Sequence, residues 1–372
     1  MTPSRETLVD LLRVLVEAET PTGDTDALER GFGVLSSLTA SMTARQPVVD
    51  HLDGTPYLYL APVANPSVLI LGHLDTVWPI GTLTQLPFCV KGDVATGPGV
   101  FDMKAGLAIA LAAIAVCATA DHVGLLVTSD EETGSSTGRA LVERYAATAC
   151  AVLVPEPAAP GGAVKMARKG VGLYEFQVVG REAHAGLEPE RGVNASIELA
   201  SLINDLTTFA DPDSGTTVTP TKATAGVTSN TVPAEATLAA DVRAWTLPEL
   251  ERVDAAVRRR TARVPGAKVL VTGGINRPPL EASSSASLLE LARQAALDTG
   301  LGGLAATGVG GGSDGNFTAA IGIPTLDGVG AVGGGAHARD EWVDLTCLEP
   351  RARWLAAVAE RAVARFTVPA EG

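Results

Sequence analysis

Three short apolar runs in the chain each end near residues that can bind a divalent metal ion. The runs and the residues that follow them are 68–72 with His73, 123–127 with Asp130-Glu131-Glu132, and 151–155 with Glu156. Uncharged runs of this length, rich in branched side chains, are typical of buried strands in a largely parallel sheet. Ligands of open α/β sheets gather beyond the carboxyl ends of such strands. The pattern therefore predicts a mixed, mostly parallel sheet with a metal site at one edge, because imidazole and carboxylate groups suit zinc and similar ions.

The hydrophobic pattern changes near residue 170 and returns to its first character near residue 276. Between these points it predicts strands and helices in the order β-α-β-β-α-β, over 171–179, 192–208, 217–227, 235–244, 247–264 and 267–272. This order is typical of a ferredoxin-like unit. We therefore predict an α/β catalytic domain of residues 1–170 and 276–372, with a ferredoxin-like domain of residues 171–275 inserted in it. Because a small open sheet has unpaired edges, we expect the insert to be a lid and dimerisation domain.

Composition and charge argue against several classes of protein. A chain of 372 residues exceeds the usual size of one hydrophobic core, so two domains are expected. Hydrophobic residues make up 46% and charged residues 19%, which argues against a disordered chain. A net charge of −14 would repel a nucleic-acid backbone. The basic cluster of Arg258–Arg260 and Arg263 follows Glu249 and Glu251 at helical spacing, so we interpret it as a solvated helix face with internal ion pairs.

Cysteine spacing and the lengths of the apolar runs predict a cytoplasmic protein. The four cysteines form no CxxC pair and no regular framework, as expected of reduced thiols in the cytosol. Residues 1–20 predict an amphipathic helix with several acids, unlike a signal peptide. The uncharged run 105–120 is shorter than the roughly 20 residues that a membrane span needs, so it predicts a buried helix. We therefore expect neither a membrane nor a nucleic acid as a partner.

A further carboxylate and a further histidine complete a candidate metal site. Asp102 follows the Gly/Pro-rich residues 97–99, so it is expected on a loop, and His337 lies in a glycine-rich segment near the C-terminal end. The candidate ligands are His73, Asp102, Glu132, Glu156 and His337. Three carboxylates and two histidines suit two divalent cations, with Asp102 shared between them. Each residue taken singly could be a core histidine or a surface acid, and it is their joint occurrence at strand ends that favours a metal site.

Two acids beside the candidate ligands have other expected roles. One carboxylate of the Glu131-Glu132 pair would be a ligand, which leaves the other to take a proton from the attacking water. Asp75, two residues after His73, can accept the second N–H of that imidazole and so orient the ring.

Four motifs in the chain are similar to those of the M20 metallopeptidases. They are Gly72-His73-Leu74-Asp75-Thr76-Val77, Gly97-Pro98-Gly99-Val100-Phe101-Asp102-Met103-Lys104, Ser129-Asp130-Glu131-Glu132-Thr133-Gly134 and Glu182-Ala183-His184-Ala185-Gly186. The resemblance covers about residues 66–345. This family includes glutamate carboxypeptidases, acetylornithine deacetylase and succinyl-diaminopimelate desuccinylase, and the chain is closest to bacterial glutamate carboxypeptidase.

The resemblance implies a site with two divalent metal ions, Zn²⁺ in the first place and Co²⁺ or Mn²⁺ as alternatives. The implied ligand sets are His73, Asp102 and Glu156 for one ion, and Asp102, Glu132 and His337 for the other. It further implies that Glu131 is the general base and that the Asp102–Met103 peptide is cis.

The resemblance also assigns three residues of the predicted insert to the substrate. His184 would reach a neighbouring active site and stabilise the oxyanion, and Asn230 would contact the substrate. Arg243 would bind a free α-carboxylate, a task that suits the bidentate guanidinium. From the residues alone, a strand-end charge paired with Asp241 or Glu235 is the better explanation of Arg243.

Two glycine-rich runs near the C-terminal end have different interpretations. The run 308–314, which contains Gly311, is similar to the family's glycine-rich loop, where bare backbone can approach a substrate. The run 328–333 fits the GxGxxG dinucleotide motif after a strand, but further glycines and His337 follow it instead of an amphipathic helix. An oxidoreductase is therefore a weak alternative.

These observations together predict a metal-dependent amidohydrolase that acts on a small peptide or an N-acyl amino acid. The resemblance implies cleavage of an amide bond beside a free carboxylate, with release of a C-terminal amino acid such as glutamate. The alternative enzyme is an N-acyl-amino-acid deacylase of the acetylornithine deacetylase or succinyl-diaminopimelate desuccinylase type. A binding protein without activity is disfavoured because Glu131 and the full ligand set are present. A homodimer formed through the insert is expected.

Overall fold

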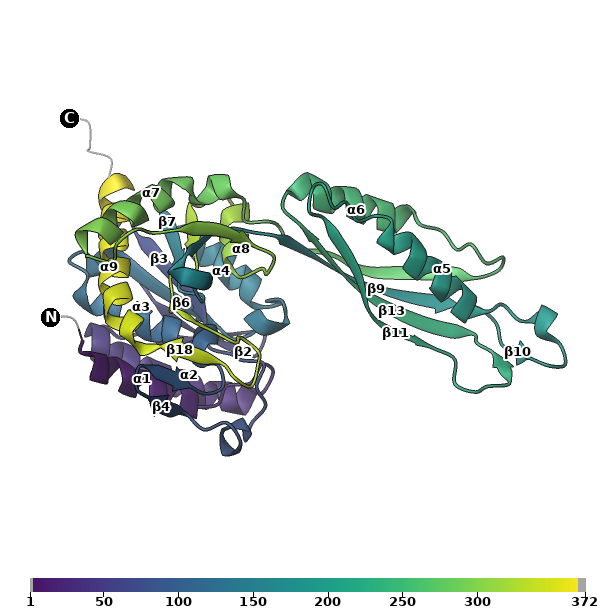
Figure 1. Cartoon of the computed structure of the whole chain (residues 1–372), viewed down its shortest axis with the longest axis horizontal. Helices are drawn as coiled ribbons and strands as arrows, with labels where there is room; N and C mark the ends of the chain where they lie inside the picture. The colour runs from purple at the N-terminus through teal and green to yellow at the C-terminus, as the bar shows by residue number, and fades with distance from the viewer. Residues whose placement is uncertain (1–2, 367–372) are drawn as a thin grey trace. The chain divides into compact units, whose positions relative to one another are not determined.

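The computed structural model describes residues 3–366, and the chain divides into two compact units (Figure 1). Unit 2 comprises Arg168–Pro279 and Gly310–Gly312, and unit 1 comprises the rest of the chain. The second unit is therefore an insertion in the sequence of the first.

The centre of unit 1 is an eight-stranded sheet in the order β1-β2-β6-β3-β7-β16-β8-β15. Its strands are β1 (Val48–Leu52), β2 (Thr55–Leu60), β3 (Val68–His73), β6 (Val123–Thr128), β7 (Ala151–Val154), β8 (Val164–Arg168), β15 (Ala306–Val309) and β16 (Thr325–Asp327). The pairs β6–β3, β3–β7 and β7–β16 are parallel, whereas β1–β2, β2–β6 and β16–β8 are antiparallel. The three apolar runs are the adjacent strands β6, β3 and β7, and all of their residues are buried. The predicted mixed, mostly parallel sheet is confirmed.

Helices cover both faces of this sheet, which explains why residues 68–72, 123–127 and 151–154 of its central strands are all apolar or glycine. The helices of unit 1 are α1 (Arg5–Glu17), α2 (Thr25–Thr43), α3 (Ala105–Val116), α4 (Gly138–Ala146), α7 (Ala282–Asp298), α8 (Gly315–Ala320) and α9 (Leu348–Phe366). On β3, Val68 and Ile70 pack in the core that includes α1, α3 and α9, while Leu69 and Leu71 pack with α4 and α8. Helix α3 is buried almost all round, as its uncharged sequence predicts.

A small second sheet in unit 1 joins two distant parts of the chain. Its order is β17-β18-β5-β4, formed by β4 (Cys89–Lys91), β5 (Val94–Thr96), β17 (Gly333–Gly334) and β18 (Trp342–Asp344). Strands β18 and β5 pair antiparallel, with Trp342 opposite Thr96. This pairing places the turn that carries His337 next to the loop that carries Asp102.

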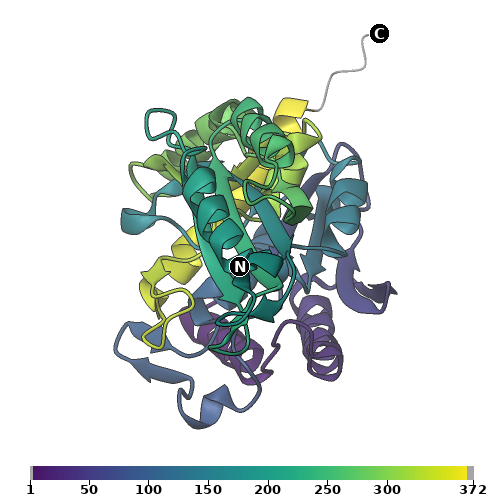
Figure 2. The same ribbon diagram turned by 90° about the vertical axis from the view of Figure 1, so that its right-hand side faces the viewer.

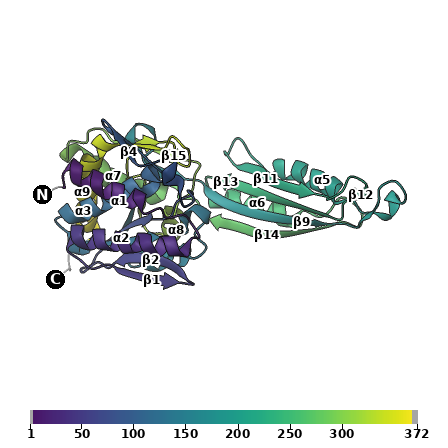
Figure 3. The same ribbon diagram turned by 90° about the horizontal axis from the view of Figure 1, so that it is seen from below.

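Unit 2 is a four-stranded antiparallel sheet with two helices on one face (Figures 1 and 2). Its elements are β9 (Gly170–Val179), α5 (Ala195–Thr207), β11 (Thr217–Ala225), β13 (Glu235–Ala244), α6 (Leu247–Arg259) and β14 (Lys268–Arg277). They follow the predicted order β-α-β-β-α-β, and the sheet order is β11-β13-β9-β14. Alternate residues of β9 and β13 form a separate core with α5 and α6. A two-stranded ribbon, β10 (Ala183–His184) with β12 (Thr231–Val232), lies at one end of the unit (Figures 1 and 3).

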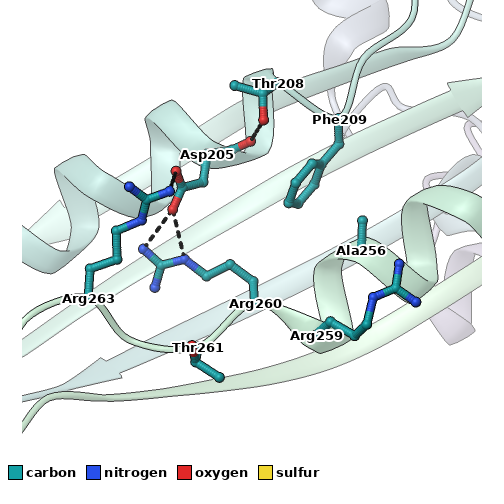
Figure 4. Close-up of a pocket in the computed structure, with 8 residues that line it drawn as sticks. All are labelled: Asp205, Thr208, Phe209, Ala256, Arg259, Arg260, Thr261 and Arg263. Carbon is teal, nitrogen blue, oxygen red and sulfur yellow. Dashed lines mark hydrogen bonds and ion pairs between the residues drawn. The ribbon is translucent and has the colours of Figure 1, made fainter.

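The basic cluster of unit 2 pairs partly within helix α6, as we expected, and partly with another segment. Arg258 binds Asp254 one turn away on α6. Helix α6 ends at Arg259, so Arg260 and Arg263 lie beyond it. Both bind Asp205 of α5 (Figure 4), and Arg260 also binds the buried carboxylate of Glu198. Arg260 is thus a buried link between two segments, which the spacing within one helix could not indicate.

The structure also bears on the membrane prediction. Among residues 3–366, no helix combines the length and the apolar character that crossing a bilayer requires.

Candidate metal centre and substrate-binding residues

The parallel strands of unit 1 bring the predicted acids and His73 to one edge of the sheet. His73 is the last residue of β3, and β3 pairs in parallel with β6 and β7. The turn Glu131–Thr133 follows β6, and Glu156 follows β7 two residues after its end. Because the carboxyl ends of parallel strands meet at one edge, these side chains converge there.

Asp102 lies between the two candidate histidines. Its Oδ1 atom is 3.4 Å from Nε2 of His73, and its Oδ2 atom is 3.6 Å from Nε2 of His337. Oε1 of Glu156 is 3.4 Å from the same His73 nitrogen, and Oε2 of Glu132 is 3.0 Å from the same His337 nitrogen. All five candidate ligands therefore lie together, in two groups that share Asp102. The Asp102–Met103 peptide is cis, as the resemblance implies.

The donor atoms of this cluster fit metal cations better than they fit one another. Within residues 3–366, Nε2 of His73, Oδ1 of Asp102 and Oε1 of Glu132 are buried and have no hydrogen-bond partner. Such atoms cost free energy in a protein interior unless something binds them. Imidazole nitrogen and carboxylate oxygen are ordinary ligands of Zn²⁺ and neighbouring ions. The residues present therefore fit a divalent metal site.

Asp75 connects His73 to the acidic turn after β6. Nδ1 of His73 lies 3.0 Å from the backbone carbonyl oxygen of Asp75 and 3.4 Å from its carboxylate. That carboxylate, which is fully buried, accepts hydrogen bonds from the Thr22 hydroxyl (2.8 Å) and from the backbone N–H groups of Glu131 (3.4 Å) and Glu132 (3.3 Å). Asp75 thus contacts both the His73 imidazole and the turn that carries Glu131. Its hydrogen bond with Thr22 could not be predicted from the sequence pattern.

The concentration of carboxylates shifts the pKa values of the site. Burial lowers the pKa of His73, but hydrogen bonds to Asp102, Asp75 and Glu156 outweigh it and hold that pKa well above its ordinary value. Burial raises the pKa of Glu132. The contact with Glu132 raises the pKa of His337 to about 9. The raised pKa values of the two histidines reflect the same dense negative charge that would attract divalent cations.

Two buried charges beside the cluster were not identified in the sequence. Glu341 is 3% exposed and follows His337 by four residues. Lys104 is 1% exposed, and burial lowers its pKa to about 8, partly offset by the negative charge of Glu341. Only Lys104 had a signal in the sequence, because it closes one of the four family motifs.

Two of the candidate substrate-binding residues lie together on the ribbon of unit 2. His184 pairs with Thr231 across the ribbon, and the N–H of Ala185 donates to the carbonyl of Asn230 at 2.9 Å. The N–H groups of Gly186 and Leu187 both donate to Nδ1 of His184, each at 3.1 Å. In the neutral ring the proton is therefore on Nε2, where it can be donated to a substrate.

The other two candidate substrate-binding residues, Arg243 and Gly311, lie at the opposite end of unit 2. Arg243 pairs with Val171 near the start of β9, and Arg168 donates to the carbonyl of Gly311 at 3.1 Å. Arg243 also binds the Asp241 carboxylate through two contacts of 2.8 Å, which is the alternative we left open for it.

The strand register sets the distance between these two groups. Glu235, beside the ribbon, and Arg243 are eight residues apart on β13, a separation of about 27 Å. Within one copy of the unit, Arg243 and His184 are therefore not brought together.

Comparison with known proteins agrees with the motifs. The profile of peptidase family M20/M25/M40 matches residues 69–361. Carboxypeptidase G2 from Pseudomonas sp. (strain RS-16) is 31% identical over 96% of this chain and 89% of its own. Succinyl-diaminopimelate desuccinylase 2 from Shewanella loihica is 31% identical over 48% of this chain and 53% of its own. An M20 family metallo-carboxypeptidase from Sulfolobus solfataricus shares the fold, with a TM-score of 0.75 at 16% identity, over 96% of this chain and 99% of its own.

The matches to the family profile and to Carboxypeptidase G2 extend over most of the chain, well beyond the four motifs. The predicted resemblance is thus confirmed, and with it the prediction of a metal-dependent peptidase. The chain belongs to peptidase family M20/M25/M40.

Proposed function

We propose that the protein is a two-metal amidohydrolase that releases a C-terminal amino acid from a small peptide or N-acyl amino acid. The observation that carries the proposal is Asp102, whose two carboxylate oxygens face different histidines at 3.4 and 3.6 Å. Similarity to a carboxypeptidase over nearly the whole chain supports the choice of reaction.

The proposed ligands form two sets, with Zn²⁺ as the expected metal and Co²⁺ or Mn²⁺ as alternatives. They are His73, Asp102 and Glu156 for one ion, and Asp102, Glu132 and His337 for the other. When bound, the ions would polarise the scissile carbonyl and lower the pKa of water.

Glu131 is the proposed general base and general acid. One of its carboxylate oxygens lies within 4.8 Å of the ligand atoms of His73 and Glu156. Its backbone N–H is directed to the buried Asp75, so the turn that carries it is held in place. From this position the carboxylate would take a proton from the attacking water and deliver it to the leaving amine.

His184 and Arg243 are proposed to bind the substrate from two different copies of the chain. Nε2–H of His184 would donate to the developing oxyanion, and the Arg243 guanidinium would bind the free carboxylate in place of Asp241. A dipeptide spans only about 7 Å. Because about 27 Å of β13 lies between Arg243 and Glu235, which is beside the ribbon that carries His184, one small substrate can reach both side chains only if a second copy supplies one of them. We therefore propose a homodimer in which unit 2 takes part, and a monomer in gel filtration would contradict it.

Mixed dimers test this arrangement. We expect Arg243→Met and His184→Ala to be inactive separately and to regain about a quarter of parental activity when exchanged together, because half of the dimers then contain one intact site. The measurement is the hydrolysis rate before and after subunit exchange. If the two inactive variants restore no activity on mixing, both residues serve the same copy. Parental activity in either variant alone would show that its residue does not serve catalysis.

A substrate panel with a chelator control tests the reaction itself. We expect metal-loaded protein to release glutamate from an N-acylated glutamate, and removal of the metal by a chelator to abolish the release. Preference for an acetylated basic amino acid would instead support the deacylase alternative, which the partial similarity to a desuccinylase keeps open. No turnover of the panel with two metal ions bound would reject both substrate classes.

A further inference from the structure

The carboxylate of Glu341 binds four N–H groups in the interior of unit 1. Its Oε1 atom accepts from the backbone N–H groups of Phe101 (2.8 Å) and Asp102 (3.0 Å). Its Oε2 atom accepts from the backbone N–H of Gly99 (2.8 Å) and from Nε1–H of Trp78 (3.1 Å). Hydrogen bonds to an ionised acceptor are stronger than those between neutral groups, so this is a substantial local restraint.

These four donors and their acceptor come from three separate loops that carry proposed site residues. Trp78 is in the loop that contains Asp75 and follows β3, and Asp102 is itself one of the donors. Glu341 ends the turn that contains His337, which is closed by bonds from Ala338 N–H to Gly335 (2.8 Å) and from Glu341 N–H to Ala338 (3.1 Å). One carboxylate therefore joins segments about 240 residues apart.

Local backbone conformation makes this arrangement possible. Gly99 has φ +70°, a region that favours glycine, and a Cβ atom there would lie 2.6 Å from Cγ2 of Thr76. The loop can therefore turn its successive N–H groups toward one anion, much as backbone nests do.

We propose that Glu341 is a positioning residue, which holds the loop of Asp102 against the turn of His337 so that the metal ligands are arranged before any metal binds. The inference rests on the ligand roles given to Asp102 and His337 under the proposed function. Glu341 itself is not proposed to touch metal or substrate. Its effect on the site passes through the backbone N–H of Asp102, whose side chain faces both histidines.

The test is Glu341→Gln, which keeps the size of the side chain and removes one of its two acceptor atoms. The new amide group would point N–H donors at two of the existing N–H donors, so at least two of the four bonds are lost. We expect metal affinity to fall by about 10- to 100-fold, as for other residues that orient ligands. Competition with a chelator gives the affinity, and the visible spectrum of the Co²⁺-loaded protein reports ligand geometry.

Two further variants separate positioning from general stability. Ser285→Ala removes a buried hydrogen bond to the carbonyl of Thr325 (2.6 Å), so it should lower the melting temperature and leave metal affinity and the Co²⁺ spectrum unchanged. Trp78→Phe removes only one of the four donors to Glu341, and an intermediate loss of affinity is expected. Parental affinity and spectrum in Glu341→Gln would overturn the proposal.

Hydrogen exchange provides a measurement that needs no variant. In the metal-free parent protein, we expect the amides of Gly99, Phe101 and Asp102 to exchange slowly, because the Glu341 carboxylate binds all three. Rapid exchange there would overturn the proposal even if Glu341→Gln does not fold. Failure of the substrate panel with two metal ions bound would reject the proposed function and leave this inference standing.

Discussion

Replacing Glu131 with glutamine is expected to lower kcat by about 10² to 10⁴-fold, with both metal ions still bound. That range is the usual contribution of a general acid–base group. The substitution keeps the size of the side chain and removes its ability to take a proton from water. Because the backbone N–H of residue 131 still reaches Asp75, the turn should keep its place. Steady-state kinetics and a metal assay on the same preparation measure both parts of the prediction.

The control for this variant is Glu143→Gln, which changes a glutamate on α4 that pairs with Arg139. It should have the parental kcat. A Glu131→Gln enzyme with the parental rate would mean that another group accepts the proton. Loss of metal from Glu131→Gln would instead mean that Glu131 is a ligand.

Replacing Asp102 with asparagine is expected to reduce the bound metal from two ions per chain to one and kcat/KM by at least about 100-fold. Asparagine offers one oxygen, whereas the Asp102 carboxylate presents one oxygen toward each histidine. Metal ions contribute several kcal/mol to the stabilisation of such transition states, and each 1.4 kcal/mol corresponds to about tenfold in rate. Elemental analysis after dialysis gives the stoichiometry.

The matched substitution is Asp53→Asn at an exposed turn of positive φ, which asparagine also tolerates. This variant should keep two metal ions per chain and the parental kcat/KM. If Asp102→Asn retains two metal ions and normal activity, the shared-ligand arrangement is incorrect.

Much of the fold was predictable because it depends on local patterns of side chains. The uninterrupted apolar runs that became β3, β6 and β7 had no polar face, so they could be stable only between two layers of helices. The order of strands and helices in unit 2 was predicted from the change in hydrophobic pattern near residues 170 and 276. The alternating burial along β9 and β13 shows that one face of its sheet is covered.

Part of the candidate site was predictable for the same reason. The ends of parallel strands meet at one edge, so the strand pattern alone was enough to expect His73 and Glu156 together. His337 was assigned from its glycine-rich segment near the C-terminal end and from the family resemblance, but its place beside Glu132 depends on the pairing of β18 with β5. Those strands are three residues long and lie far apart in the sequence, so no periodic pattern indicates that they pair.

The sequence by itself determined the fold types of the two units, the family and the set of candidate ligands. Each of these depends on short sequence motifs, on local composition or on local periodicity. Tertiary structure alone decided which atoms meet across long separations. It placed the Glu341 carboxylate on the loop of Asp102, Arg260 on the buried Glu198, and Arg243 at the opposite end of unit 2 from His184. Such contacts depend on chain path and strand register, and a single side chain carries no local signal of its distant partner.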